Sequence, residues 1–296
     1  MKHDISPAWP AGVPSKDLAM SRDYDETIAD HYRKVAEQEG LSPTSTMADE
    51  IVRAMETDAI TRFLDAAHAA KTGASSGTFR IADIGCGNGY TLGVLAQRNP
   101  EREFTGIEFS NELRALAETR VREDKLANVA IRPGDVRDPN FADNEHFDAA
   151  YCQRVLINLM DAADQRHALD NMIAKVKPGG ALLFIEAFSS ALNNLNEARE
   201  EFDLEPIPAA HHNLYLEDDF FTHPLLAPFE SAAWSVPPNL LSTHYYVSRV
   251  LAPVLRRPKP FKRNSHLAKF LSEALPPAIG DYSQLRIFAF RKSDEG

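Results

Sequence analysis

The sequence has little cysteine and no long hydrophobic run. Two cysteines, Cys86 and Cys152, among 296 residues are too few for a disulfide framework, and their spacing suggests no metal site. The longest apolar runs, such as residues 181–185, fall far short of the roughly 20 residues of a membrane-spanning helix. Prolines occupy positions 7, 10 and 14, where a signal peptide carries its apolar stretch. We therefore expect a cytoplasmic protein with reduced thiols and no membrane span.

Basic residues are also scarce. The chain has 32 Lys and Arg against 43 Asp and Glu, a formal net charge of −11, and a nucleic-acid partner would select a basic surface. We therefore expect no nucleic-acid partner. One segment opposes this trend, since residues 256–263 carry five basic residues and no acid. Such a run is either a solvated loop or a contact for an anionic substrate or an acidic surface.

The chain is otherwise typical of a globular protein, with 44% hydrophobic and 25% charged residues. Residues 1–20 are Pro-rich and aperiodic, which predicts a flexible arm. Residues 21–78 are interpreted as a helical cap. Its two predicted helices cover residues 22–39 and a second stretch that begins with a capping box at Thr46 to Asp49 and ends near Gly73.

From Phe79 onward, short β-type runs alternate with helical stretches, as in a parallel sheet with crossover helices. The predicted strands cover residues 80–84, 103–109, 129–132, 147–152 and 181–187, and the predicted helices cover residues 90–98, 111–124 and 162–175, with Ser110 and Asp161 as N-caps. Residues 79–188 are therefore predicted to form a doubly wound, Rossmann-like, mainly parallel α/β core.

Residues 189–296 are predicted to form an insertion that completes a substrate pocket, followed by the final strands of the sheet. Two β-type segments, at residues 229–236 and 284–291, flank a predicted helix over residues 245–254. No internal repeat is present in the sequence.

The string IADIGCGNG is the most informative segment. A predicted strand ends in Asp83, and Gly85, Gly87 and Gly89 follow at alternate positions before a helix. Without a β-carbon, such a turn adopts unusual dihedrals and admits a ligand close to the backbone, beside the free amides of the helix start. This pattern favours a small-molecule site.

Two acids support the same site. Glu108 ends the next predicted strand, nineteen residues after Gly89, where a carboxylate can hold two ribose hydroxyls. Phe109 beside it could lie against a base. Asp135 follows the third strand, where it could accept from the exocyclic amino group of adenine.

The glycine spacing distinguishes two classes of nucleoside cofactor. A dinucleotide fingerprint needs Gly or Ala at its sixth position, and here that position is Tyr90 or Leu92. A nicotinamide dehydrogenase is therefore disfavoured. The GxGxG form, with GIEFS, GDV, FDAAYCQRVLINL and KVKPGGALLFIE, resembles class I S-adenosylmethionine-dependent methyltransferases over about residues 80–187.

That resemblance implies S-adenosylmethionine as the cofactor and assigns roles around it. The residues of the glycine loop would surround the methionine part of the cofactor, and Glu108 would bind its ribose. Phe109, Asp135 and Val136 would contact its adenine, and Gln153 would lie at the mouth of the site. The implied cofactor-binding residues are Asp83, Gly85, Cys86, Gly87, Gly89, Glu108, Phe109, Asp135, Val136 and Gln153. No metal is expected.

The acceptor side is less clearly marked. His211, His212 and Glu186 are candidates for a general base, and Arg154 and Asn158 for orienting the acceptor. Surface, capping or structural roles remain the alternative for each. Walls of the pocket are expected from Tyr245, Tyr246 and Arg249, and a lid from the N-terminal helix with Tyr24, His31 or Tyr32.

The predicted function is methyl transfer to a small polar acceptor, a hydroxyl or amine of a sugar or secondary metabolite. DAAY at Asp148 replaces the DPPY or NPPY string of family members that act on base amino groups, which also argues against DNA. Two alternatives remain: a non-catalytic S-adenosylmethionine-binding sensor, and an NAD(P)-dependent oxidoreductase.

Overall fold

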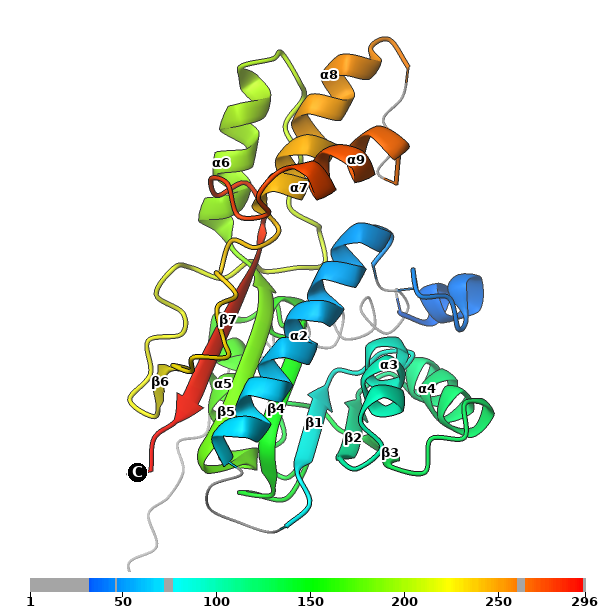
Figure 1. Cartoon of the computed structure of the whole chain (residues 1–296), viewed down its shortest axis with the longest axis vertical. Coiled ribbons are helices and arrows are strands. Elements are labelled where there is room, and N and C mark those ends of the chain that lie inside the picture. Colours follow the sequence, from blue (N-terminus) through cyan, green and yellow to red (C-terminus); the bar gives the residue numbers. More distant parts are fainter. Residues whose placement is uncertain (1–31, 46, 72–76, 260–263, 295–296) are drawn as a thin grey trace, which may run out of the picture.

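The chain folds around one seven-stranded sheet with the order β3-β2-β1-β4-β5-β7-β6 (Figure 1). The computed structural model describes residues 32–45, 47–71, 77–259 and 264–294. The strands are β1 (Arg80–Ile84), β2 (Glu103–Glu108), β3 (Val129–Pro133), β4 (Phe147–Gln153), β5 (Val176–Ala187), β6 (Leu226–Pro228) and β7 (Leu285–Lys292).

The first five strands are parallel, and β7 runs antiparallel to both β5 and β6. The order reverses at β1, because β2 pairs with one edge of this strand and β4 with the other. In doubly wound sheets a ligand crevice lies at such a reversal, outside the carboxyl ends of the strands. The predicted mainly parallel α/β fold is confirmed.

Helices cover both faces of the sheet (Figure 1). Residues 32–39 are helical and end at Gly40. The other helices are α2 (Glu50–Lys71), α3 (Tyr90–Arg98), α4 (Asn111–Glu123), α5 (Ala162–Lys175), α6 (Ser189–Glu200), α7 (Ser242–Tyr246), α8 (Ala252–Arg256) and α9 (His266–Ala274), with a 3₁₀ turn η1 (Leu156–Asn158) and a π turn η2 (Val247–Leu251).

The sheet separates two apolar cores, because alternate strand residues face opposite sides. Ile81 and Leu183 pack with Phe63 of α2 and Leu92 of α3. On the other face, residues such as Leu182 pack with α5, α6 and the C-terminal helices. The described part of the predicted helical cap thus shares its core with the strands.

Local capping signals are largely confirmed. Ser110 caps α4 by accepting from the Leu113 amide at 3.3 Å, and Asp161 caps α5 by accepting from Ala163 at 2.7 Å. Asp49 accepts from the Val52 amide at 3.2 Å, so it begins α2. Thr46, the other member of the predicted capping box, lies outside the described residues.

One predicted strand is wrong. Residues 229–236 form turns and irregular backbone, and the edge strand β6 precedes them. The apolar residues there serve the core instead, since the rings of Phe229 and Trp234 pack edge-on against Phe63 at centroid distances of 5.5 and 5.7 Å.

The helix predicted over residues 245–254 is confirmed as the continuous run α7, η2 and α8, whereas α6 and α9 were not predicted. The expected arm over residues 1–20 and the first part of the expected N-terminal helix lie outside the described residues. Among the described helices, none is long and apolar enough to span a bilayer.

Candidate active site

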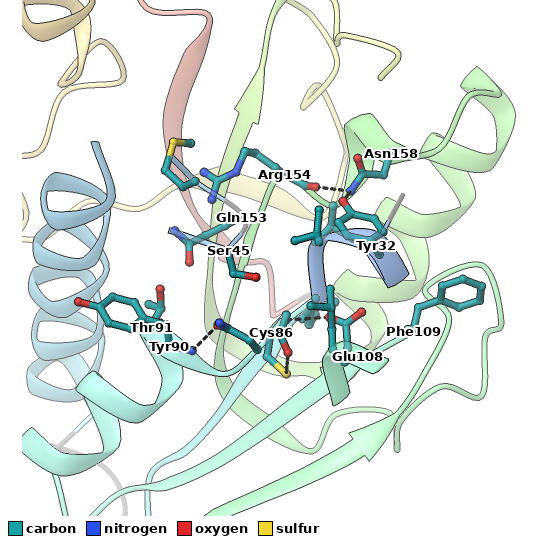
Figure 2. Close-up of a pocket in the computed structure, with 18 of the residues that line it drawn as sticks. Tyr32, Ser45, Cys86, Tyr90, Thr91, Glu108, Phe109, Gln153, Arg154 and Asn158 are labelled. Atoms are coloured by element: carbon teal, nitrogen blue, oxygen red, sulfur yellow. Dashed lines mark hydrogen bonds between the residues drawn. The ribbon is translucent and has the colours of Figure 1, made fainter. Parts of the chain in front are cut away.

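A cavity of about 440 Å³ lies at the carboxyl ends of β1, β2, β3 and β4 (Figure 2). Its floor comes from the loops that follow these strands, at residues 85–88, 108–109, 134–137 and 153–159. Residues within 32–39, 44–45 and 47–48 contribute from the N-terminal side together with Arg53, and His212 and Asn213 contribute from the C-terminal half. Its volume is in the range of small-molecule sites.

The glycine loop after β1 is held by its own backbone. The amides of Gly85 and Cys86 donate to the Ile107 carbonyl at 2.8 and 3.1 Å. Gly85 has a φ of 75°, and a β-carbon there would lie 2.4 Å from Cγ2 of Val155. Glycine at this position therefore allows both the left-handed turn and the close approach of the chain that leaves β4.

Glu108 joins the glycine loop to the end of β2. Its Oε2 accepts from the Gly87 amide at 2.7 Å and its Oε1 from the Ser110 amide at 2.8 Å. Burial raises the pKa of Glu108, although these two amides act in the opposite direction. The carboxylate is thus fixed at the cavity wall with lone pairs left for a ligand.

Asp135, after β3, is engaged by Arg137. The Arg137 guanidinium donates through Nη2 to Oδ2 at 2.7 Å and through Nε to Oδ1 at 3.0 Å. The same guanidinium lies 5.8 Å from the centroid of the Phe109 ring, which is 46% exposed. The loops after β2 and β3 therefore form one aromatic and charged edge of the cavity.

Two polar side chains, one from before α2 and one from the start of α3, lie at the cavity beside the glycine loop. Ser45 and Thr91 are 7% and 3% exposed, and neither hydroxyl oxygen has a hydrogen-bond partner within the part of the chain that the structure describes. Both residues line the cavity. Burial lowers the pKa of the nearby Arg53 to about 10, and the charge of Arg154 acts in the same direction.

The opposite wall begins where β4 ends. Gln153 Nε2 donates to Glu56 at 3.0 Å, and Arg154 forms an ion pair with the other oxygen of the same carboxylate. Asn158 Nδ2 donates to the Arg154 carbonyl at 2.8 Å and to the Tyr32 hydroxyl at 2.5 Å (Figure 2). The described end of the N-terminal helix therefore closes over the cavity through Tyr32, whereas Tyr24 and His31 lie outside the described residues.

Most of the residues predicted for the site lie together. Of the cofactor set, Gly85, Cys86, Gly87, Glu108, Phe109, Asp135, Val136 and Gln153 line the cavity, as do Arg154, Asn158 and His212 from the acceptor set.

Four residues of the predicted cofactor and acceptor sets do not line the cavity. Asp83 is buried one layer below, where burial and the charge of Glu108 raise its pKa to about 7. Gly89 faces α4, where a β-carbon would lie 3.1 Å from that of Ala117. His211 is exposed to solvent, and Glu186 is fully buried beneath the end of β4.

The predicted pocket wall lies in the C-terminal helices, outside the cavity lining. Tyr245 is buried beneath the Arg249 guanidinium, 3.7 Å from its ring centroid, and Tyr246 packs on Tyr282. Arg249 donates to Asp49 at 3.1 Å, so this group links α2 to the C-terminal helices instead.

Sequence reasoning missed Arg53, Glu56, Ser45 and Thr91. The sequence held one usable signal at the start of α2, because Asp49, Arg53 and Glu56 recur at helical spacing. In the structure all three side chains are at least 90% buried. Charged residues on a buried helix face need partners, and such a stripe therefore indicates a polar site.

Residues 81–180 match the family described as "Methyltransferase domain". Over this segment the chain is similar to methyltransferase domains. This finding confirms the resemblance to class I methyltransferases that the sequence motifs suggested.

Curated relatives match a part of the chain that is similar in length. An uncharacterized methyltransferase of Schizosaccharomyces pombe is 34% identical over 116 residues, which cover 37% of this chain and 40% of that protein. A demethylmenaquinone methyltransferase of a Geobacillus strain is 30% identical over 114 residues, 38% of this chain and 47% of that protein. The match therefore spans less than half the length of each of these relatives.

Solved structures cover more of the chain at lower identity. The N-methyltransferase NodS from Bradyrhizobium japonicum, in complex with S-adenosyl-L-homocysteine, has 17% identity and a TM-score of 0.43, and the alignment covers 75% of this chain and 83% of NodS. The [4+2]-cyclase SpnF has 20% identity and a TM-score of 0.46 over 79% of this chain and 81% of SpnF. The similarity to a methyltransferase domain is therefore supported by the sequence match over residues 81–180 and not by these two structures.

Proposed function

We propose that this protein transfers the methyl group of S-adenosylmethionine to a small polar acceptor that carries a hydroxyl or an amine. The observation that supports this function best is the position of the cavity. It opens at the carboxyl ends of β1 to β4, inside the segment that matches the methyltransferase domain, and it is lined by the glycine loop and Glu108.

The polar lining suits the cofactor. Buried polar atoms almost always have hydrogen-bond partners, so the hydroxyls of Ser45 and Thr91 are best explained by a ligand that supplies them. Both line the cavity together with the glycine loop, which fits the amino and carboxylate groups of the cofactor's methionine part. Glu108 would accept from the ribose, while Phe109 and Asp135 would contact the adenine.

S-adenosylmethionine supplies an electrophilic methyl group on a sulfonium, so the protein contributes mainly by alignment. Holding two reactants in the correct geometry is worth roughly 7 to 11 kcal/mol. The chain's own contribution on the acceptor side comes from Arg154, Asn158 and His212, which line the wall beyond the glycine loop. Their mixture of donors and acceptors suits a small polar molecule.

Calorimetry on the full chain tests the cofactor assignment. Replacing Glu108 by alanine leaves the ribose hydroxyls unpaired, and we expect it to weaken S-adenosylhomocysteine binding by about 1 to 3 kcal/mol. Glu118 on α4, whose carboxylate is 53% exposed and lies 3.8 Å from Arg114, provides the matched control. Glu118→Ala should leave the affinity unchanged. Equal affinities for wild type and Glu108→Ala would remove the ribose assignment.

A second measurement tests turnover. Tritium from methyl-labelled S-adenosylmethionine should appear in a component of a metabolite extract when the wild-type protein is added. Tight cofactor binding without any transfer across a broad extract would instead support a sensor. Binding of NAD in the absence of any S-adenosylmethionine binding would contradict the proposed function.

A further inference from the structure

The chain leaves β4 through residues 153–158, here called the β4 exit, and two buried carboxylates contact this segment from opposite sides. Glu56 of α2 contacts its side chains, and Glu186 at the end of β5 contacts its backbone. Both glutamates are 0% exposed. Neither of them lines the cavity, whereas Arg154 and Asn158 of the β4 exit do.

Glu56 fixes the first two residues of the β4 exit. One of its oxygens accepts from Gln153 Nε2 at 3.0 Å, and the other is ion-paired with the Arg154 guanidinium. Arg154 has a φ of 58°, a conformation that residues other than glycine rarely adopt. Its amide donates to the Ile185 carbonyl at 2.8 Å, so the unusual backbone and the side chain are both held.

Glu186 fixes the next three residues. Its Oε1 accepts from the amides of Val155 and Leu156 at 2.9 and 3.1 Å, and its Oε2 accepts from the Ile157 amide at 3.3 Å. The thiol of Cys152 also lies 3.5 Å from Oε1. A side chain whose oxygens are all engaged in this way is poorly suited to accept a proton from a substrate across the cavity.

Burying a carboxylate is costly unless hydrogen bonds or an opposite charge compensate for it. Here two such groups converge on six residues, and the last of these, Asn158, completes the contact with Tyr32 at 2.5 Å. A reaction whose rate depends on alignment benefits from a rigid cavity wall, because small displacements of the reactants lower the rate strongly.

We propose that Glu56 and Glu186 are positioning residues that fix the β4 exit from its two sides and thereby present Arg154 and Asn158 to the methyl acceptor. The proposal rests on the proposed function in that it assigns the fixed segment to acceptor alignment. The hydrogen bonds themselves can be tested without turnover.

The experiment compares Glu56→Gln, Glu186→Gln and Asp148→Asn in the full chain. Asp148 is a matched control, because its carboxylate is also buried and also accepts from a backbone amide, that of Arg80 at 2.8 Å, but near the opposite end of β4. Three quantities are measured for each variant: amide hydrogen exchange by mass spectrometry, S-adenosylhomocysteine affinity by calorimetry, and tritiated methyl transfer into a metabolite extract.

We expect exchange in the β4 exit to rise about 10- to 100-fold in Glu186→Gln, which is the cost of leaving a buried backbone amide without its acceptor expressed as a ratio. Glu56→Gln should lower methyl transfer at least tenfold. Both variants should change S-adenosylhomocysteine affinity less than threefold, and Asp148→Asn should leave exchange in the β4 exit and methyl transfer unchanged.

Unchanged exchange in Glu186→Gln, or a faster exchange that does not lower methyl transfer, would overturn the proposal. If Glu186→Gln does not fold, Glu186→Asp is the substitute, because it keeps the carboxyl group but is one methylene too short to reach all three amides. If the wild type neither binds S-adenosylhomocysteine nor transfers tritium, the proposed function fails, and the exchange data still decide whether the two glutamates hold the β4 exit.

Discussion

The two sides of the cavity are built differently. The glycine-loop side, residues 85–137, is one continuous stretch of chain in which the end of each strand or the loop directly after it lines the cavity. The β4-exit side combines Tyr32, His212 and residues of the β4 exit, which Glu56 contacts from outside the lining. The hydrogen bonds from this segment to Tyr32 and Glu56 join positions that are 126 and 97 residues apart in the sequence. One side follows from local geometry, and the other depends on long-range packing.

This difference has an energetic consequence. Hydrogen bonds on the glycine-loop side are mostly made by backbone groups, such as those of Gly85 and Cys86 to Ile107. On the β4-exit side, the link between α2 and the chain after β4 is the buried ion pair of Glu56 with Arg154. Outside the cavity lining, Asp49 joins the start of α2 to His244 and Arg249 of the C-terminal helices. The β4-exit side should therefore be the more sensitive one to removal of a single charge.

The largest effect is expected from Asp49→Asn. Asparagine keeps the size and can still cap α2, but it leaves the buried Arg249 guanidinium and the His244 ring without a carboxylate, and breaking a buried ion pair costs about 3 to 5 kcal/mol. Burial opposes ionisation of Asp49, but the His244 hydrogen bond and the Arg249 charge hold its pKa well below the ordinary value of 3.8. The free energy of unfolding, from denaturant titrations of wild type and variant at several pH values, measures this cost.

The sign of the pH dependence follows from linkage. A carboxyl group whose pKa is lower in the folded than in the unfolded protein stabilises the folded state at pH values above the unfolded pKa. This stabilisation is lost as the pH falls from the unfolded pKa through the folded pKa. The advantage of wild type over Asp49→Asn should therefore be complete at pH 6 and shrink below about pH 4. A difference that is constant between pH 3 and 7 would show that the charge of Asp49 is not what holds α2 to the C-terminal helices.

The second-largest effect is expected where the glycine loop contacts the β4 exit, at the boundary between the two sides of the cavity. In Gly85→Ala the new β-carbon would lie 2.4 Å from Val155, in addition to the strain of a φ of 75°. Overpacking of this kind costs about 1 to 3 kcal/mol, and the shifted loop should also weaken S-adenosylhomocysteine binding.

Gly40→Ala is the matched control for Gly85→Ala, because Gly40 has a φ of 52° but no atom within 4 Å of an added β-carbon. Thermal unfolding and calorimetry of both variants distinguish the backbone strain of a positive φ, which both share, from the steric clash with Val155, which only Gly85→Ala introduces. Equal losses in the two variants would mean that the contact between the glycine loop and the β4 exit is unimportant.

The same contrast explains what could be predicted from the sequence. Glycine spacing, strand ends and N-caps act over a few residues, so β1 to β4 and the cavity-lining residues Gly85, Glu108 and Asp135 could be predicted. The engagement of Glu186 by three amides depends on the register of β4 with β5 and on the turn that follows, and no local pattern encodes it. Residues 229–236 were misassigned for a similar reason, because tertiary packing on Phe63, not strand pairing, buries their apolar side chains.

The smallest effect should separate two neighbouring histidines. Both are adjacent in the sequence and their rings lie 5.0 Å apart, but His212 lines the cavity whereas His211 is exposed. If His212 contributes one hydrogen bond to the acceptor, His212→Ala should lower tritiated methyl transfer into a metabolite extract by about tenfold. His211→Ala should change it less than twofold, and neither should alter S-adenosylhomocysteine affinity. An equal loss in both variants would mean that the loop as a whole, and not the His212 side chain, contacts the acceptor, whereas a loss of about 10² or more in His212→Ala alone would be of the size expected for a general base.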